Sequence, residues 1–262
     1  MVEFLRVRVM YATKFVAIAV AVGAAFGTEA TAAIFSTGFE SPDYTLGALN
    51  GQQGWTKPFV VNAPITDVAS AGVGDPAVPE GSQYAKVIRS TGDARAAKQF
   101  STPALNTDPF VVDVLLAYGG VSTGSLPLVY ITNSESSFNG VIFGFQESGG
   151  QVNITYRNLN TFTTLGTAVE DTFYRFQVVI DPATASYDIE VKTLGGSLIG
   201  SAQDALSRAG VNSFSHIGLS VLTGAGTLYA DQLDISPVPE PSGLFLIGCA
   251  ASAWSIFLRR RG

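Results

Sequence analysis

The chain has 262 residues, with 15 Lys and Arg, 21 Asp and Glu, one His and one Cys, so its formal net charge is −6. Residues 33–236 hold nine basic and eighteen acidic side chains, and a net charge of −9 there would repel the phosphates of a nucleic acid. The same segment has no cysteine, which excludes a disulfide, a cysteine-ligated zinc and a cysteine nucleophile within it. We therefore expect neither a nucleic-acid partner nor thiol chemistry.

Residues 1–32 have the layout of a secretory signal peptide. Basic side chains come first, at Arg6, Arg8 and Lys14. The apolar run FVAIAVAVGAAF follows at residues 15–26, and a helix of this length spans about 18 Å, too little for a hydrocarbon core of about 30 Å. The small residues Ala30, Thr31 and Ala32 stand where a signal peptidase recognises its site, so we expect it to cut before Ala33. The alternative is a permanent N-terminal anchor or a buried helix.

The central segment, residues 33–236, alternates short apolar stretches with turns rich in Gly, Pro, Asn and Asp. We expect one domain, because no repeat or linker divides this segment, and at most two helical turns, the better one at residues 203–208. Strands are predicted at residues 34–39, 84–89, 94–100, 110–118, 126–132, 141–146, 152–157, 174–181, 186–193, 216–222 and 228–235. The predicted fold is all-β, an antiparallel two-sheet jelly-roll sandwich, flanked by the signal helix and a C-terminal transmembrane helix.

Several stretches of the central segment resemble known β-sandwiches. They are FESP at 39–42, YTLG at 44–47, LNGQQGW at 49–55, FYRFQVVID at 173–181, SYDIEV at 186–191 and YADQLDI at 229–235. The first three are similar to the opening of concanavalin A-like jelly rolls in exported bacterial proteins. The next two resemble a hairpin of laminin-G and lectin-type sandwiches, and the last fits their closing strand. The resemblance implies a fold more than an activity, because this fold hosts lectins, hydrolases, lyases and structural modules.

Residues 237–262 combine a proline-rich stretch, an apolar run and an arginine cluster. The prolines of PVPEPS fix φ and remove backbone donors, so this stretch should be extended and exposed. The apolar run at residues 243–258 predicts a helix of about 24 Å. That is short for a membrane span, but the arginines after it can snorkel to the headgroups, and they place this end on the cytoplasmic side.

This order of features resembles the PEP-CTERM sorting signal. The residues that carry the resemblance are Pro239, Glu240, Pro241, Arg259, Arg260 and Arg261. In that family an exosortase is taken to cut at the Pro-Glu-Pro tripeptide. The resemblance implies an exosortase-like processing enzyme, an inner-membrane intermediate, and a final place at the cell surface or in the extracellular matrix. The alternative is a plain C-terminal membrane anchor with a proline-rich stalk.

The sequence offers little support for catalysis. His216 is the one histidine and lies on a predicted strand, so a metal site of two or three histidines is excluded and no motif identifies a triad. The Glu-x-Asp-x-x-Glu motif of lectin-like glucan hydrolases is absent. Asp188 and Glu190 come nearest to it, and alternation places them on the solvated face of a strand. We predict a non-enzymatic protein with no catalytic residue.

One cation site is expected from the resemblance. In jelly-roll carbohydrate-binding modules, a Glu after the first strand and an Asp in the last strand often share a Ca²⁺. Glu40 and Asp231 hold comparable positions here, with Asp234 nearby, which implies a structural calcium. The alternative is that these are ordinary surface carboxylates, and no other cofactor is expected.

Sugar binding needs aromatic ring faces that stack on a pyranose. The candidates are Trp55, Tyr118, Tyr130 and Tyr156, with Phe162 as a further option, although each could instead belong to the core. The leading hypothesis is an exported surface or matrix protein that binds exopolysaccharide without catalysis. A glycan-active hydrolase or lyase is the first alternative, and a purely structural surface protein is the second.

Overall fold

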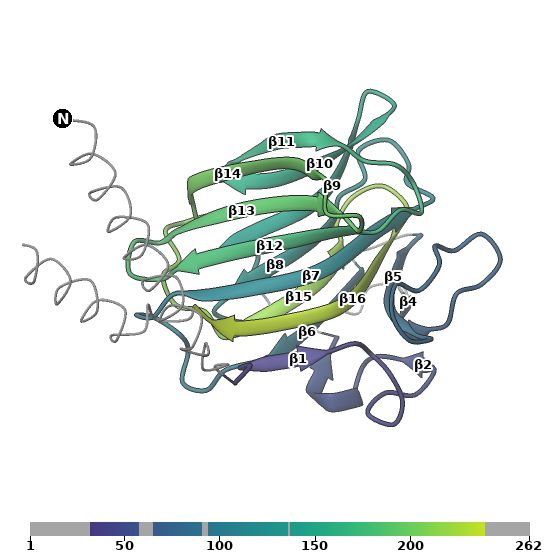
Figure 1. Ribbon diagram of the computed structural model, residues 1–262, viewed down its shortest axis with the longest axis horizontal. Coiled ribbons are helices and arrows are strands. Elements are labelled where there is room, and N and C mark those ends of the chain that lie inside the picture. Colours follow the sequence, from purple (N-terminus) through teal and green to yellow (C-terminus); the bar gives the residue numbers. More distant parts are fainter. Residues whose placement is uncertain (1–31, 58–64, 91–93, 136, 239–262) are drawn as a thin grey trace, which may run out of the picture. The chain divides into compact units, whose positions relative to one another are not determined.

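The structure is a computed structural model that describes residues 32–57, 65–90, 94–135 and 137–238. These residues form two antiparallel sheets and one short 3-10 helix, η1 (Gln52–Gly54) (Figure 1). The expected signal peptide and C-terminal apolar helix lie outside the described residues. In the described part of the chain, no helix combines the length and the apolar character that a membrane crossing requires.

The larger sheet, called sheet A here, has nine strands in the order β14-β13-β12-β7-β16-β5-β4-β2, with β1 paired to β16. Its strands are β1 (Phe35–Thr37), β2 (Gly47–Ala48), β4 (Ile65–Ala69), β5 (Tyr84–Arg89), β7 (Phe110–Gly119), β12 (Tyr174–Asp181), β13 (Ser186–Thr193), β14 (Leu198–Leu206) and β16 (Gly226–Pro237). Because β16 pairs with β1, the first and last strands of the domain lie side by side.

The smaller sheet, called sheet B here, has seven strands in the order β11-β10-β9-β8-β15-β6-β3. Its strands are β3 (Trp55–Thr56), β6 (Ala94–Gln99), β8 (Pro127–Thr132), β9 (Val141–Ser148), β10 (Gln151–Asn158), β11 (Thr161–Thr167) and β15 (His216–Val221). Neighbouring strands in both sheets run antiparallel and the sheets face each other across a core, which is consistent with the expected jelly-roll sandwich.

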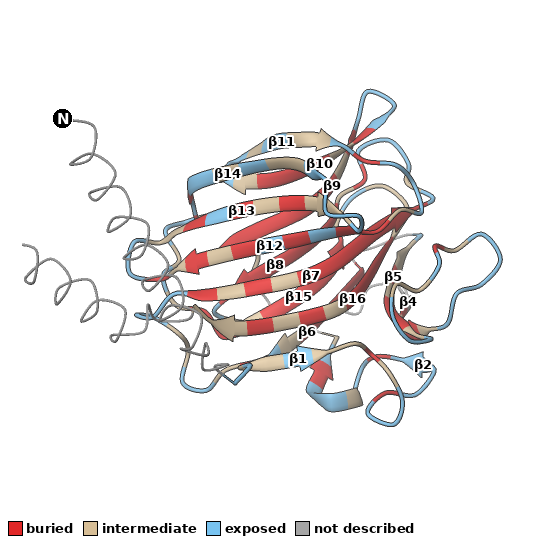
Figure 2. Ribbon diagram, viewed as in Figure 1, coloured by how far each residue is buried: buried red, intermediate tan, exposed pale blue. Residues whose placement is uncertain are grey.

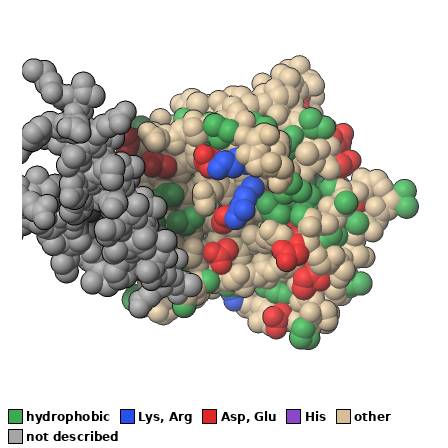
Figure 3. Space-filling model, viewed as in Figure 1, with side chains coloured by type: hydrophobic (Ala, Val, Ile, Leu, Met, Phe, Trp, Pro, Cys, Tyr) green, Lys and Arg blue, Asp and Glu red, His purple; other side chains and the backbone are tan. Residues whose placement is uncertain are grey.

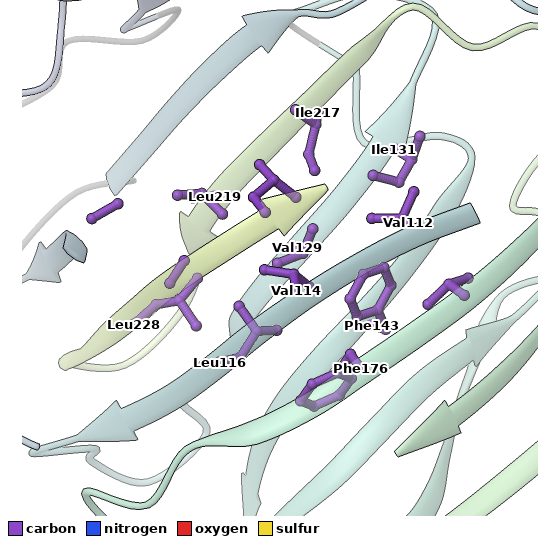
Figure 4. Packing of buried hydrophobic residues seen from close by; sticks show 14 of the residues in the cluster. Val112, Val114, Leu116, Val129, Ile131, Phe143, Phe176, Ile217, Leu219 and Leu228 are labelled. Atoms are coloured by element: carbon purple, nitrogen blue, oxygen red, sulfur yellow. The ribbon is translucent and has the colours of Figure 1, made fainter. Parts of the chain in front are cut away.

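The main core fills the space between the two sheets because successive residues of a strand point to opposite faces. Figure 2 shows this alternation along β12, in which every second residue, beginning with Tyr174, is buried. In Figure 4, Val114 of sheet A and Val129 of sheet B point into the same layer. The rings of Phe143 and Phe176 stack there from opposite sheets, with centroids 5.6 Å apart.

The predicted all-β class and the two antiparallel sheets are confirmed. Each predicted strand is present, and β5, β12 and β13 have the predicted bounds. The predicted helical turn at residues 203–208 is wrong, because residues up to Leu206 belong to β14 and pair with β13. Strand β14 is an edge strand with mostly exposed residues, so it lacks the apolar alternation that marks a strand in a sequence.

Candidate functional site

Two hollows in the described surface hold the polar side chains of interest. We call the first one the acidic recess. Its volume is about 1080 Å³, and it lies beside β1 and β16. The carboxylates that line it are Glu40, Asp43, Glu80, Asp113, Asp231 and Asp234. The fold therefore brings the predicted pair, Glu40 and Asp231, to one place because β1 pairs with β16.

Asp231 lies at a bulge in β16, where the register against β7 shifts between Asp231 and Asp234. The bulge places Gln232 at a φ of 46°, and its N–H donates to Oδ1 of Asp231 at 2.8 Å. The side chain of Asp231 is fully buried, and its Oδ2 has no hydrogen-bond partner among the described residues. Burial raises the pKa of Asp231 to about 7. Hydrogen bonds from the backbone of Gln232 and Glu80 lower this pKa in part, and the charges of Glu40 and Glu80 raise it.

Glu40 joins the segment after β1 to the loop before β5. Its Oε1 accepts the N–H groups of Ser82 at 2.8 Å and Gln83 at 2.7 Å, and its Oε2 accepts the hydroxyl of Ser82 at 3.0 Å. Gly81 allows this approach, because a Cβ there would lie 2.3 Å from Oε1. The position of Glu40 is thus fixed by the fold, close to the buried carboxyl of Asp231.

The acidic recess has side chains that could hold a cation. Among the described residues, no group of three or more His, Cys, Asp and Glu side chains is arranged to hold a metal ion. The buried Asp231 Oδ2 is nevertheless a hard ligand without a partner, and Ca²⁺ takes its other ligands from backbone oxygens as well as carboxylates.

We call the second one the arginine hollow. It lies on the outer face of sheet B, opposite the main core. Leu128, Tyr130 and Ile142 form a separate buried cluster on that face, and Phe138 of the β8–β9 loop covers it. The ring centroids of Tyr130 and Phe138 are 4.6 Å apart. Gly218 makes room for Tyr130, because a Cβ there would lie 1.9 Å from its Cζ.

The arginine hollow has a volume of about 280 Å³ and is lined by three arginines from distant parts of the chain. Arg95 comes from β6, Arg157 from the end of β10, and Arg208 from the segment after β14. Phe138 and Phe162 also line it, above a floor of buried aliphatic side chains. An apolar floor with a few convergent polar groups is the usual composition of a ligand site.

The surrounding structure holds these guanidinium groups in place. Arg95 lies over the ring of Phe138, with Cζ 3.5 Å from its centroid. Arg208 donates from Nη1 to the carbonyl of Phe138 at 3.1 Å, and its own backbone forms a two-bond bridge with Gly140. Arg95 is therefore held by a cation–π contact with the β8–β9 loop, and Arg208 by hydrogen bonds to Phe138 and Gly140 of the same loop.

Arg157 is held by the turn between β10 and β11. Its Nε and Nη2 donate to the carbonyls of Leu159 and Asn160, each at 3.3 Å. Its guanidinium lies 5.2 Å from the ring centroid of Phe162. Burial lowers the pKa of Arg157, and the nearby positive charge of Arg208 lowers it further.

The burial of the four predicted sugar-binding aromatic residues contradicts that prediction. The exposed fractions of Trp55, Tyr118, Tyr130 and Tyr156 are 1, 4, 0 and 8%, so none presents a ring face to a sugar. Large rings supply the apolar area that a core needs, which is why sequence alone does not separate them from a binding platform. The fifth candidate, Phe162, is half-buried and lines the arginine hollow.

The remaining residues that the sequence singled out are His216, Asp188 and the sorting residues. His216 Nδ1 lies 2.8 Å from the hydroxyl of Ser215, but that hydroxyl is buried and also donates to the carbonyl of Asn133 at 3.2 Å. Burial lowers the pKa of His216. Asp188 is exposed on β13, as expected of a solvated strand face. The sorting residues at 239–241 and 259–261 lie outside the described residues.

Comparisons with known proteins find solved structures with a similar fold. The structure is similar to a carbohydrate esterase from the Shiga toxin-encoding bacteriophage phi24B, with 12% sequence identity over 79% of this chain and 99% of that chain and a TM-score of 0.53. It is also similar to lectin II from Ulex europaeus, with 9% identity over 73% of this chain and 95% of that chain and a TM-score of 0.45. The fold that the chain shares with the esterase is a sandwich of two antiparallel sheets, consistent with a jelly roll.

A third similar structure is a sialidase, with 10% identity, 70% coverage of this chain and a TM-score of 0.47. The match spans 17% of the sialidase chain, about a sixth of its length. At such low identities these likenesses concern the fold alone. No family model matches the sequence, and no curated protein matches it.

Proposed function

We propose that this protein is exported to the cell surface or extracellular matrix and there binds a polysaccharide without cleaving it. The arginine hollow is the observation that carries this proposal, since it combines an apolar floor, two half-buried phenyl rings and anchored hydrogen-bond donors. The fold adds support only in a general sense: the similar structure with a TM-score of 0.53 is named a carbohydrate esterase, but one fold hosts many functions.

We propose that the protein does not cleave the polysaccharide because its candidate catalytic groups, the Asp231 carboxyl and the Ser215 hydroxyl, are buried. A glycosidase needs two carboxyl groups that both contact the sugar, about 5 to 10 Å apart. The raised pKa of Asp231 suits a general acid, which is the observation in favour of a hydrolase, but its full burial keeps it from a substrate. The Ser215 hydroxyl beside His216 is buried as well.

Binding and cleavage are tested together with the full-length chain in mild detergent. Its affinity for neutral and acidic polysaccharides is measured by calorimetry, and each mixture is then assayed for new reducing ends and for unsaturated sugar products. The proposal expects binding to at least one polysaccharide and no new products. Binding to none of them would contradict polysaccharide recognition, and new products would contradict a non-catalytic role.

Export and C-terminal sorting are proposed from the sequence. The support is the signal-like segment at residues 1–32 and the resemblance of residues 237–262 to a PEP-CTERM signal. The partners would be a signal peptidase, an exosortase-like enzyme, and the membrane before processing. The intact mass of the native protein from producing cells tests this, with cuts expected before Ala33 and near Pro239-Glu240-Pro241. A cytosolic protein that still carries both Met1 and Gly262 would contradict it.

We also propose that Glu40 and Asp231 hold a structural Ca²⁺ in the acidic recess. The unpartnered, buried Oδ2 of Asp231 and the adjacent Glu40 support this, since a hard cation would offset both charges. The melting temperature of the full-length chain should then be higher in Ca²⁺ than in EGTA, and Asp231→Asn should remove the difference. Equal melting temperatures for the parent protein in both buffers would contradict the site.

A further inference from the structure

The distribution of positive charge over the domain is uneven. Residues 33–236 contain nine Lys and Arg against eighteen Asp and Glu, and three of the nine line the arginine hollow. Among the described residues, no Asp or Glu side chain lines this hollow. Three of the nine basic side chains therefore meet at one place on the outer face of sheet B.

Three basic side chains of sheet A, Lys86, Arg175 and Lys192, form ion pairs with acids. On the face shown in Figure 3, blue side chains lie beside red ones. Arg175 contacts Asp113 at 2.7 Å across β12 and β7, and Lys86 contacts Asp75 at 2.7 Å. Neither Arg157 nor Arg208 forms an ion pair with any described residue.

Arg157 and Arg208 instead act on each other. Both are half-buried, and the charge of Arg208 contributes to the lowered pKa of Arg157. Two like charges at such a place destabilise the folded state unless an anion offsets them. The fold holds both groups in place through backbone carbonyls, which is the pre-organisation that a binding site for an anion needs.

The two groups also retain hydrogen-bond donors. A guanidinium has five N–H donors in a planar fork, and the bonds to carbonyls use two on Arg157 and one on Arg208. The remaining donors suit the paired oxygens of a carboxylate or sulfate, which bind guanidinium groups through charge-assisted hydrogen bonds.

We infer that the arginine hollow binds the anionic group of an acidic polysaccharide, a carboxylate or sulfate on a sugar ring, between Arg157 and Arg208. The apolar C–H face of the same sugar would lie against the floor of Leu128 and Ile142. The volume of about 280 Å³ is at the small end for ligand sites, so the hollow would take a single sugar unit of a longer chain. This inference rests on the proposed polysaccharide binding and specifies that the polysaccharide is acidic.

Matched polysaccharides test the ligand class, again with the full-length chain in mild detergent. Polygalacturonate is compared with its fully methyl-esterified form, and dextran sulfate with dextran, so that each pair differs in charge. We expect binding to at least one charged member, at least tenfold tighter than to its neutral partner, and weaker binding as the salt concentration rises, because salt screens exposed charges. The two charged polymers distinguish a carboxylate from a sulfate ligand.

Variants test the location of the site. Arg157→Gln and Arg208→Gln should each weaken binding of the preferred charged polymer roughly tenfold or more, the size expected for a lost charge-assisted hydrogen bond. Arg175→Gln is the matched control, because it removes the same charge from the opposite sheet and should leave the affinity unchanged. Melting temperatures of the variants separate lost binding from lost folding. Arg157→Lys keeps the charge but not the fork, and should recover only part of the affinity.

The outcomes separate the two proposals. Equal affinity for the charged and neutral members of both pairs would overturn the inference and leave polysaccharide binding intact. Tight charged binding that is weakened as much by Arg175→Gln as by Arg157→Gln would also overturn the inference, because the anion would then bind elsewhere. Binding to none of the polymers would overturn both the inference and the proposed function.

Discussion

At the scale of single residues, Asp231 has surroundings that are unusual for a carboxylic acid. The carboxyl is fully buried at a bulge, and its neighbours Glu40 and Glu80 are acidic as well. Burial and like charge both disfavour the ionised form, so the folded protein holds the proton more tightly than the unfolded chain does. Such a group links folding to pH.

This linkage gives a signed prediction for the protein in EGTA. The pKa of Asp231 rises from 3.8 in a solvated chain to about 7 in the fold, so the free energy of unfolding should fall as pH rises through this interval. The fall should amount to about 1.4 kcal/mol for each pH unit within it. Asp231→Asn, which cannot ionise, should lose less stability than the parent between pH 4 and about 7 in urea unfolding. Parallel pH profiles for the two proteins would contradict the assignment.

Gly218 gives a second residue-scale prediction. A methyl group there would overlap the ring of Tyr130, which packs against Phe138, one of the residues that line the arginine hollow. Gly218→Ala should lower the free energy of unfolding by about 1–3 kcal/mol, the usual effect of overpacking a closed site. Gly195→Ala is the control, because the added Cβ would meet only Thr193 Oγ1 at an ordinary 3.8 Å. Equal stability of the two variants would show that Tyr130 can move aside freely.

At the scale of elements, the sequence predicts central strands better than edge strands. Strands β12 and β13 have alternating buried and exposed residues, so their bounds agree with the prediction. Strands β2, β3, β4, β11 and β14 are missing from the prediction. Strands β2 and β3 have only two residues each. In β11 and β14 most side chains are exposed, which leaves no apolar alternation to detect. Backbone pairing with a neighbour, rather than a pattern of its own, makes each of them a strand.

The difference between central and edge strands predicts how fast their backbone amides exchange hydrogen with the solvent. Strand β7 lies between β12 and β16 and is mostly buried, whereas β14 lies at the edge of sheet A. Amides of β7 should exchange only through global unfolding, and those of β14 through local opening at a much lower free energy. Mass spectrometry of exchanged peptides would measure this. Equal protection of peptides from β7 and β14 would contradict the assigned strand order.

At the scale of the whole molecule, the candidate site is harder to predict than the fold. Strand pairing follows local patterns, and pairing of β1 with β16 brings Glu40 and Asp231 into one recess as expected. The arginine hollow depends on Arg95, Arg157 and Arg208, which lie far apart in the sequence. Arg95 and Arg157 come from β6 and β10 of sheet B, whereas Arg208 follows β14 of sheet A and reaches the hollow through its bridge to Gly140. The one available signal was that basic residues are scarce in this acidic domain.

Protection of individual arginines from a guanidinium-specific reagent tests the central claim most directly. The full-length chain is treated with phenylglyoxal, with and without saturating preferred polysaccharide, and the modified peptides are quantified by mass spectrometry. The polysaccharide should protect Arg157 and Arg208 while Arg175, on the opposite sheet, reacts as before. If polysaccharide binds and the reactivities of Arg157 and Arg208 do not change, then the outer face of sheet B is not where this protein binds it.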